Sequence, residues 1–527
     1  MSDRQSEPDA DPRRGALVRG VIVWTTALAL LLQPVFATAR QEVKLPDLGG
    51  NAEVLPPDEA RTFPSDFRNF MRSRGMLIED PVINSYFTEM GFRLVMHSSG
   101  RTQDFHFHIL KVPGINAFAA PAGVVALNAG LVLAADSADE VAGVVAHEIS
   151  HVTQDHLSRG MEEARSVSIP VMLATLGLVM VGGMAGALDG NAAQGILATG
   201  SGLAQQAQIN YTRQNESEAD RIGIQLLARA GYDPEGMVSF FDTLNRWVRT
   251  QGAGAPEYLR THPMTVTRVA EARQRTEQIA DPKRPATSDE RFDFVQARLR
   301  VLMTNDPAGA IEYFQTRLSR GQGREAAMRY GLALALIGAR RTSEAREQVE
   351  WLLSANPEDQ LFRMLDGDLM VAEGQTARAL EAFGALYRDY GHSATVSLAY
   401  AEVLLRSDDP EHAQRASDLL QKQLRRNPGD SQVSELLARA ADRAGDPVRA
   451  AEAVATHYYQ LGGLPQAIEQ LQRVLDRSDL DYYDRARISA KLDQMRLERL
   501  RADPRAGDRA DSARVSRDRK SSVMIQS

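Results

Sequence analysis

The spacing of apolar residues changes along the first third of the chain. Between residues 64 and 95 apolar positions recur at helical spacing, which predicts two helices. Residues 105–110 alternate and are rich in aromatics, and residues 123–128 form a short apolar run between Pro and Gly signals; both patterns predict strands of a small sheet. Residues 137–159 then predict one helix, with Asp136 or Ser137 as its N-cap and an acidic first turn.

Beyond residue 290 the pattern becomes that of repeated helical pairs. Frames with the period of tetratricopeptide repeats, about 34 residues, begin at Ala326 and Gln360, and further units begin near Ala394, Ser431 and Leu464. Small and apolar residues fall on the anchor positions of the first two frames: Leu332, Ala333, Leu336, Ala345, Val349 and Pro357, then Gly367, Ala379 and Phe383. These frames predict an α-solenoid over residues 290–502, with an unrelated helical bundle as the alternative. The polar tail, residues 503–527, lacks apolar periodicity, which predicts disorder.

The N-terminus has the pattern of an export signal. Arg13, Arg14 and Arg19 precede an apolar stretch at residues 21–32, and the small residues 37–39 follow it. We expect a signal peptide over residues 1–39, cleaved near Ala39, and a mature protein in an oxidising compartment. An uncleaved membrane anchor is the alternative.

Charge and composition restrict the chemistry. The formal charge of −8 and the absence of Lys/Arg clusters in the body of the chain argue against a nucleic-acid partner, because phosphate binding needs concentrated positive charge. The chain has no cysteine, which excludes disulfides, thiolate sites and a lipoprotein anchor. Any metal must therefore be held by histidine and carboxylate ligands.

The motif H-E-x-x-H occurs within the helix expected at residues 137–159. On a helix, positions four apart share a face, so His147 and His151 can both reach one Zn²⁺, and Glu148 projects beside them. His156 lies five residues past His151 and is turned off this face, so we expect it to be structural.

A second, acidic segment completes the ligand set. Glu216 and Asp220 lie four residues apart, so on a helix Glu216 can be the third zinc ligand while Asp220 accepts a hydrogen bond from a ligand imidazole. Glu218 points away from this face and is expected to be solvated. This E-x-x-x-D arrangement is typical of the thermolysin-like class of zinc peptidases.

The ligand set predicts a mechanism. Three protein ligands leave one zinc position for water, whose pKa the metal lowers, and Glu148 accepts the proton of this water and returns it to the leaving amine. The donor that stabilises the oxyanion remains open between Tyr211 and His262.

Several short motifs accompany these residues in one order. They are Asn-Ala-Phe-Ala at 116–119, Pro-Ala-Gly at 121–123, Gly-Leu at 130–131 and Thr-His-Pro at 261–263. With them the chain resembles the HtpX/Ste-type zinc metallopeptidases. The resemblance implies an α+β, mostly α fold, with a gluzincin-like peptidase domain over residues 40–285, a small sheet and one zinc per chain. It also implies that the strand at 123–128 lines the cleft and pairs with an extended substrate.

The resemblance implies a role for His262 as well. This histidine precedes Pro263 and is followed by Arg268, as in the His-Pro element of the family. As an extra zinc ligand, His262 would hold the enzyme at rest. Fixing a loop, or donating to the transition state, are the alternatives.

By the same resemblance the protein is a periplasmic endopeptidase in outer-membrane quality control. It would promote the assembly of β-barrel proteins and degrade stalled ones, with the repeats binding the barrel-assembly machinery. A second hypothesis is a chaperone or scaffold that acts through the repeats, with proteolysis secondary. A metal-binding protein without catalysis is disfavoured by Glu148.

An uncharged apolar stretch begins at Val167 and ends at Leu188, long enough for a transmembrane helix. A single crossing would place His151 and Glu216 on opposite sides of the bilayer, which the zinc site forbids. We expect an apolar flap that contacts the membrane surface or unfolded clients; a re-entrant hairpin is the alternative.

Overall fold

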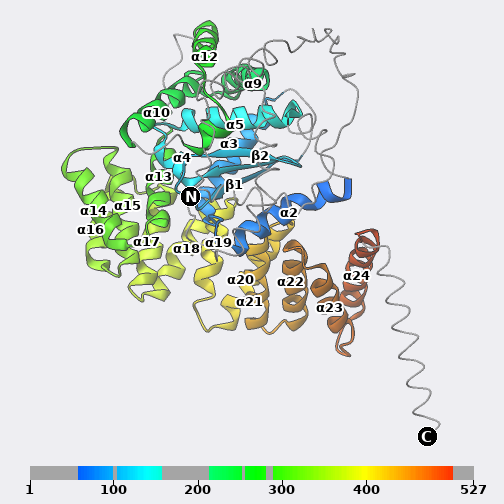
Figure 1. Ribbon diagram of the computed structural model, residues 1–527. Helices are drawn as coiled ribbons and strands as arrows, with labels where there is room; N and C mark the ends of the chain where they lie inside the picture. Colours follow the sequence, from blue (N-terminus) through cyan, green and yellow to red (C-terminus); the bar gives the residue numbers. More distant parts are fainter. Residues whose placement is uncertain (1–56, 99–103, 157–212, 252–255, 280–288, 503–527) are drawn as a thin grey trace, which may run out of the picture. The chain divides into compact units, whose positions relative to one another are not determined.

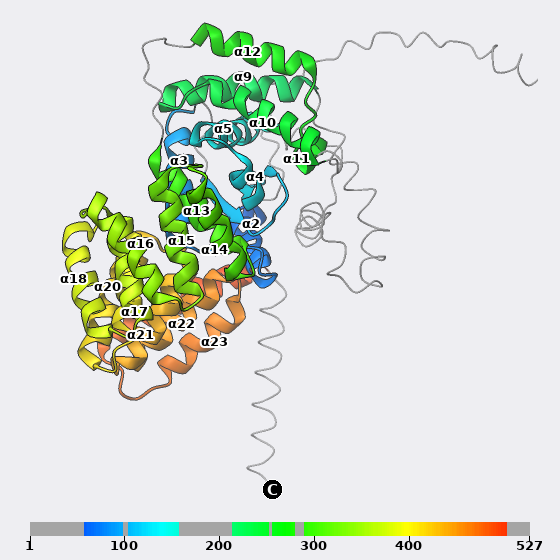
Figure 2. The same cartoon turned by 90° about the vertical axis from the view of Figure 1, so that its left-hand side faces the viewer.

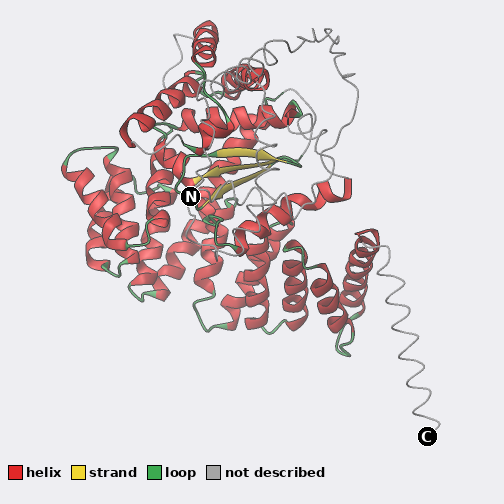
Figure 3. Cartoon of the chain, in the orientation of Figure 1, coloured by secondary structure: helices red, strands yellow, loops and turns green. Residues whose placement is uncertain are grey.

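The computed structural model describes residues 57–98, 104–156, 213–251, 256–279 and 289–502 (Figure 1). The predictions for the signal peptide, the apolar stretch 167–188, Tyr211 and the tail lie outside these residues. Within the described ranges, no helix has the length and apolar character needed to cross a membrane. Helices dominate, with one small sheet, so the expected α+β, mostly α class is confirmed (Figure 3).

The N-terminal part combines the sheet with eight described helices. The strands are β1 (His106–Leu110), β2 (Ala117–Ala120) and β3 (Val124–Asn128). The helices are α2 (Pro57–Ser73), α3 (Pro81–Val95), α4 (Ala129–Ala134), α5 (Ala138–Thr153), α9 (Arg213–Ala230), α10 (Glu235–Gln251), α11 (Glu257–Thr261) and α12 (Val266–Ile279). Helices α2 and α3 confirm the two helices expected between residues 64 and 95, and β1 and β3 confirm the two expected strands.

The sheet has the strand order β1-β3-β2. Strand β1 runs parallel to β3, and β2 pairs antiparallel with the other edge of β3. The sequence did not reveal β2, because its four residues, Ala-Phe-Ala-Ala, show no clear alternation.

The two faces of the sheet pack on different helices. Val124 and Ala126 of β3 face Phe63 and Phe67 of α2. Their neighbours in β3, such as Val125, belong to the core that includes α3 and α5. This alternation is the period of two that a pleated strand imposes. The sheet is thus enclosed between α2 and the helix that carries H-E-x-x-H.

Helix α5 begins as expected and ends early. The Ser137 hydroxyl accepts a hydrogen bond from the Glu140 amide and caps the helix. The helix ends at Thr153, so the expectation that it continues to residue 159 is wrong. Asp155 has a φ of +52°, in the left-handed region that interrupts a right-handed helix.

The C-terminal part is a series of paired helices. They are α13 (Glu290–Met303), α14 (Pro307–Ser319), α15 (Glu325–Gly338), α16 (Thr342–Ala355), α17 (Gln360–Ala372), α18 (Thr376–Tyr390), α19 (Ala394–Leu404), α20 (Pro410–Arg426), α21 (Ser431–Arg443), α22 (Pro447–Gln460), α23 (Leu464–Leu475) and α24 (Tyr482–Ala502). Helices α15, α17, α19, α21 and α23, labelled in Figure 1, begin within one residue of the five expected frame starts. The expected anchors are buried, apart from Pro357, which follows the end of α16.

Helix α13 contributes to two hydrophobic cores. Its Phe292, Val295 and Leu299 pack in the core that contains α3, α5 and the sheet. On its other side, Phe294 and Ala297 pack with α14 to α17. The helix at the start of the solenoid therefore also closes the core of the N-terminal part.

Candidate metal centre

Helix α5 positions the two histidines of H-E-x-x-H. His147 and His151 lie one turn apart, and their Nε2 atoms are 3.0 Å apart. Each residue is only 1% exposed. Two imidazoles are thus held edge to edge in a site closed to bulk solvent.

Helix α9 lies against α5 and brings in the third residue, Glu216 (Figure 2). One carboxylate oxygen of Glu216 lies 3.4 Å from Nε2 of His151, and the other lies 3.5 Å from Nε2 of His147. The approach depends on Gly223 of α9, where a Cβ atom would lie 3.3 Å from the backbone nitrogen of His147. A larger residue at 223 would push α9 and Glu216 away from the histidines.

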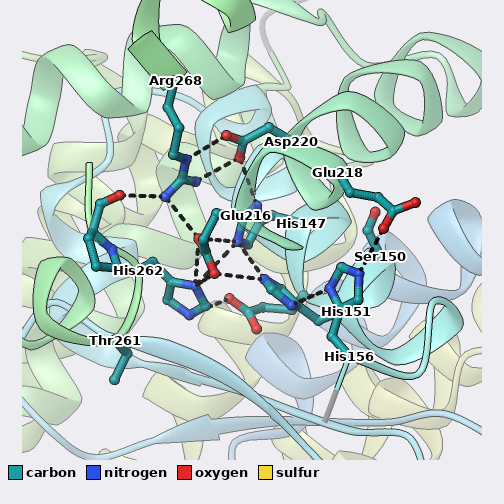
Figure 4. A network of polar contacts seen from close by, with 12 residues as sticks. His147, Ser150, His151, His156, Glu216, Glu218, Asp220, Thr261, His262 and Arg268 are labelled. Atoms are coloured by element: carbon teal, nitrogen blue, oxygen red, sulfur yellow. Dashed lines mark hydrogen bonds and ion pairs between the residues drawn. The ribbon is translucent and has the colours of Figure 1, made fainter. Parts of the chain in front are cut away.

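His262 reaches the same point from the end of α11. Its Nδ1 atom lies 3.3 Å from Nε2 of His147 and 3.2 Å from both oxygens of Glu216. One donor atom each from His147, His151, Glu216 and His262 lies within 4.8 Å of the other three, and all four residues are buried (Figure 4).

The donor chemistry of this cluster fits a cation. Asp220 lies 2.9 Å from Nδ1 of His147, and because a carboxylate accepts hydrogen bonds, Nδ1 donates to it and Nε2 faces the cluster. Burial lowers the pKa of His147, but its hydrogen bonds to Asp220 and Glu216 outweigh burial and raise it to about 10. The centre therefore favours a positive charge between these groups, as a metal ion would supply.

Arg268 of α12 holds both carboxylates of α9. Its Nε and Nη2 atoms donate to the two oxygens of Asp220 at 2.7 and 2.8 Å, and its Nη1 lies 2.8 Å from Glu216. The same Nη1 donates to the backbone oxygen of Pro263, beside His262. Burial raises the pKa of Asp220, but the bonds to His147 and Arg268 outweigh burial and lower it. Sequence reasoning had placed Arg268 in a motif without a contact; its spacing from His262 was the available signal.

Glu148 lies next to the cluster and has no exposed surface. No donor among the described residues makes a hydrogen bond of ordinary geometry to either of its carboxylate oxygens. Nε2 of His262 lies 3.5 Å from Oε1 of Glu148. Burial raises the pKa of Glu148, which favours a group that can take up and release a proton.

Two residues that we placed off the metal face join this network: His156, expected to be structural, and Glu218, expected to be solvated. Nδ1 of His156 lies 2.8 Å from Nδ1 of His151, and Nε2 of His156 lies 3.3 Å from Glu218. The expectation of a solvated Glu218 is therefore wrong, because its side chain is only 32% exposed and contacts a buried histidine. The early end of α5 brings His156 back toward His151, and sequence spacing alone could not reveal this turn.

The role expected for the strand at residues 123–128 is also wrong. Both edges of β3 are occupied, one by β1 and the other by β2, so β3 cannot pair with a substrate. Strand β2 lies at the edge of the sheet, and no described strand pairs with its outer side. Its residue Ala119 lies beside Glu148, since the Ala119 backbone is among the groups that lower the pKa of that carboxylate.

Comparisons with known proteins agree with this geometry. The model of peptidase family M48 matches residues 84–276, which include every residue of the cluster, and the model of the TPR domain of cytochrome c-type biogenesis protein H matches residues 350–462. The "Beta-barrel assembly-enhancing protease" of Escherichia coli (strain K12) is 32% identical over 467 residues, 88% of this chain and 93% of the relative. Its namesake in Yersinia pestis is 33% identical over 457 residues, 86% of this chain and 91% of the relative.

A further relative is similar over a shorter stretch. The "Mitochondrial metalloendopeptidase OMA1" of Arabidopsis thaliana is 31% identical over 155 residues, 29% of this chain and 28% of the relative. The near full-length similarity and the two matching family models identify a metalloprotease with tetratricopeptide repeats. The chain therefore belongs to peptidase family M48, in the group that joins this peptidase to a C-terminal tetratricopeptide-repeat domain.

Proposed function

We propose that the protein is a zinc-dependent endopeptidase of the periplasm that acts on unfolded or stalled outer-membrane proteins. In this proposal His147, His151 and Glu216 hold one Zn²⁺ per chain and Glu148 is the general base. One observation carries it: donor atoms of His147, His151 and Glu216 lie within 4.8 Å of one another beside the buried carboxylate of Glu148. The peptidase domain is assigned to residues 40–285 and the repeat domain to residues 290–502.

The zinc would supply Lewis-acid activation of water and of the peptide carbonyl. Glu148 takes the proton of the attacking water and returns it to the leaving amine, and its raised pKa suits both steps. Asp220 holds the ring of His147 with Nε2 facing the centre, and Arg268 holds Asp220. The hydrogen-bond donor for the oxyanion remains a choice between Tyr211 and His262.

The edge of β2 supports an extended substrate. Backbone groups on the outer side of an edge strand can pair with an incoming strand, and such pairing accepts many side-chain sequences. Strand β2 lies beside Glu148, so a peptide paired there would pass close to the base. Unassembled barrel proteins expose unpaired strands of this kind, and the near full-length relatives are named for enhancing β-barrel assembly.

The site of action follows from the predicted signal peptide. We propose that the mature chain starts near Arg40 and that residues 167–188 contact the membrane surface peripherally. N-terminal sequencing and alkaline carbonate extraction of the envelope fraction test both points. A cleaved protein that resists extraction would favour the re-entrant hairpin.

The decisive experiment measures zinc content and casein cleavage of the purified mature protein and of Glu148→Gln. The variant should keep its zinc and lose cleavage, because Glu148 is not a ligand in this proposal. Glu235→Gln, the same substitution at an exposed position of α10, is the control and should keep both its zinc and its cleavage activity. A wild-type protein without zinc, or a Glu148→Gln variant with full activity, would contradict the proposal.

The same variant separates proteolysis from a chaperone or scaffold role. If Glu148→Gln restores envelope integrity in a deletion strain, binding through the repeats to barrel-assembly machinery is the main function. If Glu148→Gln fails to restore envelope integrity while wild type succeeds, proteolysis is the main function.

A further inference from the structure

A line of three side chains leads from His151 away from the metal centre. Nδ1 of His151 lies 2.8 Å from Nδ1 of His156, and Nε2 of His156 lies 3.3 Å from an oxygen of Glu218 (Figure 4). His156 is 2% exposed, so its ring is fixed by its surroundings. Glu218 lies at the partly exposed end, where Arg221 is 3.6 Å away.

The direction of the hydrogen bonds along this line is determined by its outer end. A carboxylate accepts hydrogen bonds, so Nε2 of His156 donates to Glu218. In a neutral imidazole the other nitrogen is then the acceptor, so Nδ1 of His156 accepts the proton of Nδ1 of His151. His151 is left with a lone pair on Nε2, the atom that faces His147 and Glu216.

Glu218 supports His151 as Asp220 supports His147, except that the ring of His156 lies between the carboxylate and the ligand. Glu216, Glu218 and Asp220 all lie on α9, on two successive turns. One helix thus offers a ligand and, behind the two histidines, one carboxylate each. Outer partners of this kind orient metal-bound histidines and raise metal affinity.

We propose that His156 and Glu218 are positioning residues that fix the tautomer and the orientation of His151 for metal binding. This inference rests on the proposed zinc site. By this inference His156 acts on the metal centre through His151 and is not itself a zinc ligand.

The test compares His156→Leu with His156→Asn. The amide oxygen of Asn is bonded to Cγ, as Nδ1 of His is, so Asn keeps an acceptor for His151 while Leu fills the space without one. We expect His156→Leu to lower zinc affinity by about 10- to 100-fold and to change the visible spectrum of the Co²⁺-substituted protein, with His156→Asn close to wild type. Competition with a chromogenic chelator measures the affinity, and circular dichroism checks folding.

Glu218→Ala is a second test of the proposal, and it leaves the buried ring of His156 in place. It should lower zinc affinity less than His156→Leu does, and should have no effect in the His156→Asn background, because Asn does not extend to Glu218. Arg229→Ala, at an exposed position of the same helix where the side chain bonds to Gln225, is the control and should leave affinity unchanged.

The outcomes separate this inference from the function it rests on. If wild type binds no zinc, the proposed function fails. If wild type binds zinc and His156→Leu binds it equally well, or if Leu and Asn weaken binding to the same extent, the positioning role is overturned. Should His156→Leu not fold, the Glu218→Ala comparison in the two backgrounds decides.

Discussion

Each residue in the proposed ligand set is buried. We expect His147→Ala, His151→Ala and Glu216→Ala each to lower zinc occupancy strongly, because a three-ligand site cannot readily substitute a lost donor. Atomic absorption on the purified variants measures this. His97→Ala, at an exposed position of the same domain, should keep full occupancy. Full occupancy in Glu216→Ala would reassign the third ligand.

Asp220→Ala should act more mildly than loss of a ligand. The carboxylate contacts His147 only through the outer ring nitrogen, so affinity or activity should fall by about 10- to 100-fold, as for other outer partners of metal-bound histidines. Zinc titration and casein cleavage together measure the effect. Loss as complete as in His147→Ala would indicate that Asp220 holds the helices rather than the ring.

His262 gives two opposite expectations, and its position favours restraint. Its Nδ1 atom lies with the donors of the proposed ligands, and a fourth protein ligand would occupy the place of the water that Glu148 activates. We therefore expect His262→Ala to raise basal cleavage, including self-cleavage, while zinc stays bound. If His262 is instead the oxyanion donor, turnover should fall by roughly 10²- to 10³-fold. One activity assay with a zinc determination distinguishes the two.

At the scale of residues, the sequence predicted those side chains whose direction is set by their spacing on a single helix. His147 and His151 on α5, like Glu216 and Asp220 on α9, needed only a helical period to share a face of their helix. The contacts of His156 and Glu218 depend on where α5 ends, and those of Arg268 depend on how α12 packs on α9. Neither is set by local spacing.

The helices around the metal centre approach one another through glycine. At Gly236, in the first turn of α10, an added Cβ would lie 2.4 Å from the backbone carbonyl of Asp139 in α5. Gly236→Ala must therefore move α10 away from the metal helix, at a cost of about 1–3 kcal/mol, typical of overpacking. Differential scanning calorimetry should show a lower Tm.

Gly338→Ala is the matched control for this substitution. Gly338 is also helical, at the end of α15, and an added Cβ there meets nothing within 4 Å. Because Ala favours helix over Gly, this variant should be at least as stable as wild type. Equal losses at Gly236 and Gly338 would show that helix approach is not the cause.

The helices and strands were more predictable from the sequence than the contacts between them. Periodicity located α2, α3, α5, β1, β3 and the frames of the repeats, because each carries its own pattern of apolar residues. The order of the strands in the sheet was not predictable, so the sequence offered no check on the substrate strand that the family resemblance implied. Which strand lies at the edge depends on pairing across the sheet, and the short β2 gave no local signal.

The peptidase and the repeats are tied together by ion pairs between α3 and α13. Arg298 lies 2.7 Å from Asp80, the N-cap of α3, and the two side chains are 19% and 9% exposed. Arg298→Ala leaves Asp80 without this partner, which should cost about 3–5 kcal/mol, as for a broken buried pair. The thermal transition of the whole chain should shift downward, and limited proteolysis should cut earlier.

Arg291→Ala provides the control from the same helix. Arg291 also pairs with α3, through Glu89 at 3.2 Å, but both side chains are about half exposed. Such surface pairs contribute at most about 1 kcal/mol, so this variant should melt close to wild type. Similar effects of the two variants would mean that burial of the Arg298 pair contributes little.

The shared helix α13 has a consequence for the order in which the chain becomes active. The peptidase residues are synthesised first, yet their core lacks Phe292, Val295 and Leu299 until the start of the solenoid has also left the ribosome. Until then the metal helix packs in a core with one side open. We therefore expect newly made protein to complete its peptidase core only once the repeat domain has begun to fold, so that proteolysis would start late in the molecule's own biogenesis.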